Sequence, residues 1–194
     1  MPKNTDEKTD ESLMALVSGG DHQAFSVLVR RHADRFYGLA YRMILDRAEA
    51  EDVVQEAFLK IWNKPDIWNS ARGVRFTTWF YRIVTNGAID VARKRIKLAP
   101  TDIMDQWADE RAGQDAEMEK REAQAHLESA IQLLPVQQKA ALNLCFYEGL
   151  SNKEAADILG VGLKALESLL MRAKTGLRDR LMREQKIERR ERHG

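Results

Sequence analysis

The chain has 194 residues, of which 44% are hydrophobic and 31% charged, a balance typical of a folded, charge-rich protein and not of a disordered one. Its formal net charge of +1 hides an acidic middle and a basic C-terminal end. The lone Cys145 excludes an internal disulfide, and the polar N-terminus and the absence of an apolar run near 20 residues exclude a signal peptide and a membrane helix, so we expect a cytoplasmic protein.

The first stretch of the chain predicts helices. After a loose polar end, residues 1–10, apolar residues recur at helical spacing from Glu11 until Gly19-Gly20 ends the pattern. Asp21 is a good N-cap for a second helix that keeps the 3.6-residue period to about Ile44, and Asp46 is a good N-cap for a third.

The third helix, from Ala48 to about Trp62, has an acidic and an apolar side. Its acids lie mostly in the first turns, where they gain from the helix dipole. The alternative is an acidic docking face for a partner helix. The periodicity does not decide between these interpretations.

A break at residues 63–66 leads into an irregular loop, residues 69–75. We expect Thr77 or Thr78 to cap the next helix, which carries aromatic residues at its start and basic residues up to Lys97. Rings on which bases stack, next to cations that hold phosphates, are typical of single-stranded nucleic-acid binding. The alternative is that the rings belong to the core and that the basic run is a solvated helix end.

The helical pattern fails over residues 98–122, where acids dominate, so this segment is interpreted as an acidic linker between domains. Helical periodicity resumes at Ala123, and Pro135 is predicted to lie at a helix start. We therefore expect an all-α protein of two compact helical domains joined by a flexible linker, with a further loose end at residues 184–194.

The stretch from Leu150 to Arg178 predicts a helix-turn-helix. Ser151 and Glu154 form a capping box, and Gly160-Val161-Gly162 makes a turn short enough to cross one helix over the other. A basic run follows, as in helices that read DNA. An ordinary helical hairpin is the alternative.

No pattern of catalytic chemistry is present. The sequence has no Gly-rich phosphate loop, nucleophile elbow or paired metal-ligand motif, and its four histidines lie far apart. We therefore expect a binding protein that needs no cofactor or metal, and not an enzyme.

Together these parts resemble a bacterial sigma factor of the small extracytoplasmic-function type. Residues 20–25 are similar to the family's Gly-Asp-x-x-Ala-Phe opening, and residues 50–62 to the helix that docks on the β′ clamp coiled coil of RNA polymerase. Residues 76–94 resemble the segment that melts the minus-ten element, and residues 134–177 the domain that reads the minus-35 element.

The resemblance implies domains over residues 11–97 (polymerase docking and minus-ten melting) and 123–183 (minus-35 reading). Implied partners are core RNA polymerase, through its β′ clamp coiled coil and β flap, promoter DNA, and a cognate anti-sigma factor. The implied polymerase contacts are Asp52, Gln55, Glu56, Phe58 and Trp62. The implied minus-ten contacts are Asn69, Ser70 and Arg72 in a pocket for a flipped base, and Trp79, Phe80, Arg82, Asn86, Arg93 and Lys94 along the melted strand. The implied minus-35 contacts are Lys164, Glu167, Ser168, Met171, Arg172 and Lys174.

The recognition helix departs from the family pattern, because Ala165, Glu167 and Leu169 stand where members often have Thr, a basic residue and Arg. Either the Glu167 carboxylate accepts a hydrogen bond from a cytosine amino group, or the helix is shifted and its cations supply most of the affinity. Two rival functions remain at this point: a helix-turn-helix regulator that binds duplex DNA without polymerase, and a helical adaptor without nucleic-acid contact.

Overall fold

The computed structural model describes residues 5–69, 73–98 and 126–191, with side chains up to residue 183 apart from that of Leu98. Every regular element in these ranges is a helix, so the all-α prediction is confirmed. A helical stretch over residues 126–132 precedes α6. The elements are η1 (Thr5–Glu7), α1 (Asp10–Ser18), α2 (His22–Ile44), α3 (Arg47–Asn63), η2 (Pro65–Ile67), α4 (Phe76–Leu98), α6 (Val136–Leu142), η4 (Asn143–Tyr147), α7 (Asn152–Leu159) and α8 (Leu163–Glu191).

Side-chain caps start the first long helices where the sequence predicts them. The Asp21 carboxylate accepts hydrogen bonds from the backbone N–H groups of Gln23 and Ala24, at 2.9 and 3.0 Å. The Asp46 carboxylate accepts one from Glu49 at 3.0 Å. These bonds satisfy backbone donors that a helix leaves without a partner in its first turn.

The start of α4 differs from the prediction. The helix begins at Phe76, so Thr77 and Thr78 lie inside its first turn, and neither is the cap. The Phe76 N–H instead donates to the Glu11 carboxylate of α1 at 3.3 Å. A residue far away in the sequence therefore satisfies this helix end.

Helices α1 to α4 pack around a cluster of aromatic rings. Phe36, Phe76 and Phe80 are fully buried, and Phe80 lies edge-on to Phe36 with 4.6 Å between ring centroids. Phe58 of α3 lies 4.8 Å from Phe80. These rings fix α4 between α2 and α3.

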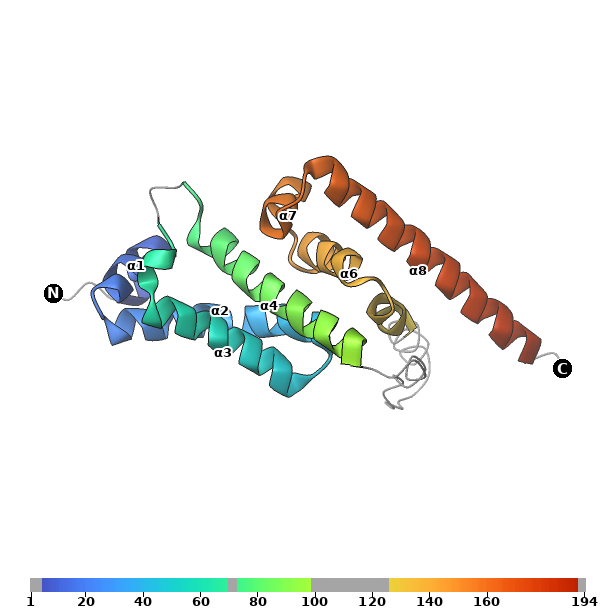
Figure 1. Ribbon diagram of the computed structural model, residues 1–194, viewed down its shortest axis with the longest axis horizontal. Coiled ribbons are helices and arrows are strands. Elements are labelled where there is room, and N and C mark those ends of the chain that lie inside the picture. The colour runs from blue at the N-terminus through green and yellow to red at the C-terminus, as the bar shows by residue number, and fades with distance from the viewer. Residues whose placement is uncertain (1–4, 70–72, 99–125, 192–194) are drawn as a thin grey trace.

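The C-terminal helices form the predicted helix-turn-helix. The Ser151 side chain accepts from the Glu154 N–H while the Glu154 carboxylate accepts from the Ser151 N–H, so the capping box is formed. Gly160 ends α7 with φ 66°, a left-handed conformation that glycine adopts without steric strain. Helix α8 then packs along α6, with Leu166 fully buried (Figure 1).

The two groups of helices pack directly against each other. Helix α4 contacts α6 and α7, and buried residues of both groups form one continuous apolar cluster. Figure 1 shows α4 lying between α2 and α3 on one side and the C-terminal helices on the other.

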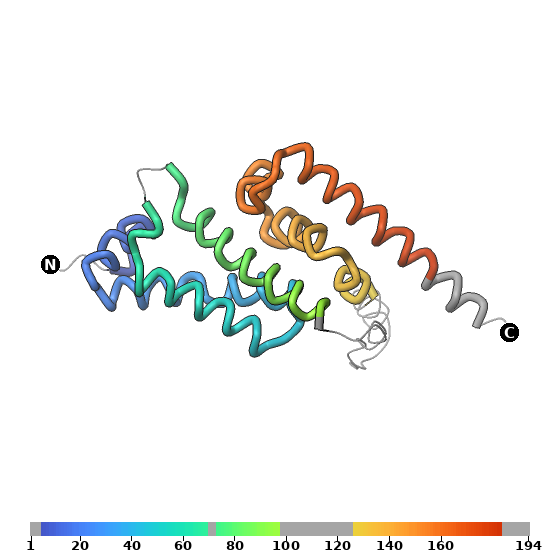
Figure 2. The backbone as a smooth tube through the Cα atoms, viewed as in Figure 1, coloured from blue at the N-terminus to red at the C-terminus, as the bar shows by residue number. Residues whose placement is uncertain are grey.

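Helical structure extends further into the chain ends than the sequence predicts. Residues 5–7 form a 3-10 helix, α1 starts at Asp10, and α8 continues to Glu191, well beyond residue 183. The tube in Figure 2 shows α1 near one end of the molecule and α8 running towards the other. The acidic linker, apart from Leu98 at the end of α4, lies outside the described residues.

Candidate nucleic-acid interface

The predicted docking helix α3 presents one polar, solvent-exposed face. Asp52, Gln55 and Glu56 are exposed on it, as expected for residues that meet a partner. Phe58 is only 5% exposed and packs in the core, so its predicted contact with a partner is wrong for this conformation. Trp62 is half-buried, with its ring 4.4 Å from that of His22.

The acids of α3 divide into two groups. Those near the helix start are paired with one cation, since Arg95 contacts Asp46 at 2.6 Å and Glu49 at 2.8 Å. A backbone hydrogen bond from Glu49, with the Arg95 charge, holds the pKa of the Asp46 carboxyl below its usual value. Within the described residues Asp52 and Glu56 form no ion pair, so the first-turn acids stabilise the fold and the later ones remain available to a partner.

Aromatic residues of α4 do not all face solvent. Phe80 has no exposed surface, because Phe36, Phe58 and Phe76 surround it, so the prediction that it flanks a melted strand is wrong for this conformation. Trp79 is half-buried, with its ring 6.1 Å from Phe76, and keeps part of its surface accessible. Of the two adjacent rings, only Trp79 can offer a stacking surface.

Polar and basic side chains line the solvent side of α4. Asn86, Arg93 and Lys94 are exposed. Arg82 is also exposed, but its guanidinium donates a hydrogen bond to the Asp157 carbonyl at the end of α7. Positions 82, 86 and 93 follow helical spacing along one face, which suits contact with an extended, negatively charged strand.

The loop before α4 is closed by a tryptophan that the sequence analysis did not single out. The Trp68 indole N–H donates to the Val74 carbonyl at 3.2 Å, which ties together the two sides of the loop. Asn69 is exposed beside it, whereas Ser70 and Arg72 lie outside the described residues. The Trp68 ring meets Phe76 edge-on at 6.0 Å, so the loop is anchored on the aromatic core. The sequence signal that could have singled out Trp68 is its position directly before an irregular loop that contains glycine.

The first turns of α8 carry the predicted recognition residues on an accessible surface. Lys164, Glu167, Met171, Arg172 and Lys174 are exposed. Ser168 is half-buried, and its hydroxyl donates to the Lys164 carbonyl at 2.9 Å, so it is partly engaged by its own helix.

Two neighbouring contacts shape this surface. The Lys174 ammonium lies 5.0 Å from the centre of the exposed Phe146 ring, a cation–π distance. Leu166 and Leu170 point into the core and fix which face of α8 is outward. The exposed face of α8 therefore presents one acidic and several basic side chains, on a helix that can enter the major groove of DNA.

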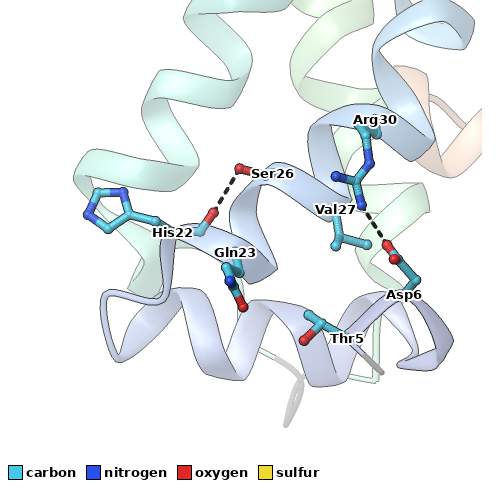
Figure 3. Close-up of a pocket in the computed structure, with 7 residues that line it drawn as sticks. All are labelled: Thr5, Asp6, His22, Gln23, Ser26, Val27 and Arg30. Carbon is cyan, nitrogen blue, oxygen red and sulfur yellow. Dashed lines mark hydrogen bonds and ion pairs between the residues drawn. The ribbon is translucent and has the colours of Figure 1, made fainter. Parts of the chain in front are cut away.

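A pocket of about 440 Å³ lies in the N-terminal group of helices, between η1 and the start of α2 (Figure 3). Its polar groups engage one another: Arg30 Nη2 pairs with Asp6 Oδ1 at 2.6 Å, and the Ser26 hydroxyl donates to the His22 carbonyl at 2.9 Å. The described residues contain no cluster of potential metal ligands, and no helix among them is long and apolar enough to cross a membrane.

Comparison with known proteins gives matches over both groups of helices. Residues 28–97 match the family described as sigma-70 region 2, and residues 125–177 match sigma-70 region 4. The ECF RNA polymerase sigma factor SigW of Bacillus subtilis is 31% identical over 176 residues, 85% of this chain and 92% of that protein. SigE of Mycolicibacterium smegmatis, also an ECF RNA polymerase sigma factor, is 35% identical over 158 residues, which cover 79% of this chain and 60% of SigE.

A solved structure is similar over most of its length. The structure of CnrH in complex with the cytosolic domain of CnrY shares 26% sequence identity with this chain and superposes with a TM-score of 0.66. The similarity covers 89% of this chain and 96% of that one. Fold and sequence therefore agree over both helical units.

Proposed function

This chain belongs to the extracytoplasmic-function family of RNA polymerase sigma factors, and from that membership we infer that it binds core RNA polymerase and directs it to specific promoters. One observation carries the assignment: region 2 and region 4 sequences occur in the family's order, each on its own group of helices. The relatives are transcription initiation factors, so the chain acts by binding and not as an enzyme. We place it in the cytoplasm, with polymerase and DNA.

We propose that α3 docks on the β′ clamp coiled coil. Its exposed face offers the carboxylates of Asp52 and Glu56 and the amide of Gln55 to polar or basic groups of the partner. Trp62, half-exposed at the end of the helix, adds apolar contact area. Phe58 contributes by holding α3 on the core.

We propose that α4 and the preceding loop hold the melted minus-ten strand. Trp79 supplies a stacking surface, and Arg82, Asn86, Arg93 and Lys94 line the path of the phosphates. Asn69, with Ser70 and Arg72, would receive a flipped base. Strand opening without ATP is reasonable, because unstacking costs a few kcal/mol and each stacked base returns about 1–3 kcal/mol.

We propose that α8 reads the minus-35 element with its exposed first turns. The side chains for this contact are Lys164, Glu167, Ser168, Met171, Arg172 and Lys174. Glu167 is the side chain with a base-specific role in this set, as an acceptor for a cytosine amino group. Domain boundaries at residues 11–97 and 123–183 follow from this division, with the acidic segment between them as the linker.

A cognate anti-sigma factor is the proposed regulator. CnrH was solved with the cytosolic domain of CnrY, and a sigma factor of Bartonella quintana was solved with its anti-sigma factor. The exposed docking face of α3 and the apolar side chains exposed on α8 would attract such a partner. Of the polymerase surfaces, the β flap is the one we assign to the C-terminal domain.

The docking assignment is tested with the double variant Asp52→Ala, Gln55→Ala. Both side chains are exposed, so the fold stays intact while the affinity for core polymerase falls about tenfold or more, as at an interface hot spot. Asp34→Ala removes an exposed acid of α2 and serves as the control. Binding of labelled chain to core polymerase gives the affinity, and unchanged affinity of the double variant would refute the assignment.

A further inference from the structure

A buried carboxylate joins the two helical units. Glu148 follows η4, and only 5% of its side-chain surface is exposed. Its Oε2 accepts hydrogen bonds from Arg35 Nε at 2.8 Å and from the Tyr81 hydroxyl at 2.6 Å. Its Oε1 accepts from Arg42 Nη2. Every one of these donors belongs to α2 or α4 of the N-terminal unit, while the acceptor belongs to the C-terminal unit.

Further polar contacts cross the same interface. Arg42 Nε donates to the Asn143 side-chain oxygen at 2.9 Å, and the Gln132 amide donates to the Arg42 carbonyl at 2.8 Å. Arg82, on the proposed strand-binding face of α4, donates to the Asp157 carbonyl. The interface therefore occupies one of the side chains that the minus-ten strand needs.

This packed arrangement cannot contact both promoter elements. By their names, the minus-ten and minus-35 elements lie about 25 base pairs apart, roughly 85 Å of duplex at 3.4 Å per base pair. In the packed form α4 touches α7, the helix that precedes the recognition helix. The two units must therefore separate before α4 and α8 can reach their elements together.

We propose that Glu148, held by Arg35, Arg42 and Tyr81, is a latch that keeps the free chain in a closed, promoter-incompetent form, which polymerase binding opens. The effect of the latch on promoter binding rests on the proposed function. The latch itself rests only on the contacts of Glu148. The docking helix α3 packs on α2 and α4 and lies across the N-terminal unit from α7 and α8 (Figure 1). Polymerase can therefore engage the closed chain through α3, and opening follows that encounter.

Glu148 controls the equilibrium between the closed and open forms because its negative charge compensates two cations at the interface. Side-chain exposure is 50% for Arg35 and 31% for Arg42, so both are partly desolvated in the closed form. Removing the carboxylate leaves both cations without a negative charge beside them at the interface, whereas water solvates them in the open form. Loss of the latch consequently shifts the equilibrium towards the open form.

The test measures the distance between the units in the full chain, without polymerase or DNA. Spin labels are placed at Lys60→Cys on α3 and Thr175→Cys on α8, both exposed positions, in a Cys145→Ser background. Electron-spin distance measurements should give a single narrow distance distribution for the otherwise wild-type chain. Glu148→Gln should add a long-distance population, with an open-to-closed ratio raised about tenfold.

Two further variants keep the test decisive. Tyr81→Phe removes only the hydroxyl and leaves the buried ring in place, so it should shift the distances the same way even if Glu148→Gln does not fold. Asp34→Asn removes an exposed carboxylate of the same helix as Arg35 and should keep the wild-type distribution. The latch is overturned if the wild-type chain is already broadly distributed, or if Tyr81→Phe keeps the wild-type distance.

Failure of the latch and failure of the proposed function give different results. A chain that directs transcription but shows unchanged distances in both latch variants is a sigma factor without a latch. A chain whose distances respond but that never binds core polymerase has the closed form but not the function.

Discussion

Replacing Phe80 distinguishes a core role from a nucleic-acid role. The ring has no exposed surface and contacts Phe36 and Phe58 at centroid distances of 4.6 and 4.8 Å. Phe80→Ala removes a buried ring and leaves a cavity among its neighbours, which should lower the unfolding free energy by about 3–5 kcal/mol. Urea unfolding followed by circular dichroism measures that decrease.

Trp79→Ala is the matched comparison, because Trp79 is adjacent but half-exposed. It should cost less stability than Phe80→Ala, and should weaken binding of single-stranded minus-ten DNA by the polymerase-bound chain by about 1–3 kcal/mol, the usual contribution of one stacked base. If Phe80→Ala unfolds at the wild-type urea concentration yet no longer binds DNA, the core assignment is wrong.

Variants at the basic end of α4, at a helix crossing and at a buried lysine give three further tests. Arg93→Ala with Lys94→Ala should flatten the salt dependence of minus-ten strand binding by about 0.7 for each phosphate that the variant no longer neutralises, and an unchanged slope would contradict their role. In Gly87→Ala the new Cβ would lie 3.0 Å from Val53 Cγ1, so an overpacking cost of about 1–3 kcal/mol should outweigh the gain of about 1 kcal/mol in helix propensity; relief of this cost by Val53→Ala in urea unfolding checks the cause. Burial lowers the pKa of Lys139 to about 8, so between that pKa and about 10.4 this side chain binds more protons in the unfolded chain than in the folded one. Its contribution to the unfolding free energy should therefore rise with pH across this window by up to about 3 kcal/mol, which the difference in unfolding free energy between wild type and Lys139→Met measures.

Local chemistry made much of the fold predictable. Asp21, Asp46 and Ser151 cap helices because the capping bond joins residues two or three apart, which the sequence displays directly. Gly160 likewise marks the end of α7 through its own backbone conformation. The helix-turn-helix, built from such local signals, is confirmed, but its second helix, α8, continues beyond Arg178 to Glu191.

Long-range contacts account for what the sequence did not reveal. Helical spacing shows that Trp79 and Phe80 point in different directions, but only packing against Phe36 and Phe58 decides which ring is buried. Glu11 satisfies the start of α4 from a different helix, so Thr77 and Thr78 looked like better caps than they are.

The interdomain contact was also beyond sequence reasoning. Glu148 meets its partners more than a hundred residues away in Arg35 and Arg42, and no periodicity connects them. For the candidate site, helical spacing correctly placed the polar face of α3 and the outward face of α8 in solvent. Which of their side chains bind remains a prediction from the family resemblance.

Promoter-directed transcription in vitro tests the central claim most directly. Purified chain is added to core RNA polymerase with candidate promoters, obtained by mapping transcription start sites after overexpression of the chain. Transcripts should begin at defined starts only when the chain is present, and should disappear with Asp52→Ala, Gln55→Ala. Absence of such transcripts, with tight operator binding by the chain alone, would contradict the claim. It would identify a helix-turn-helix regulator that binds duplex DNA without polymerase.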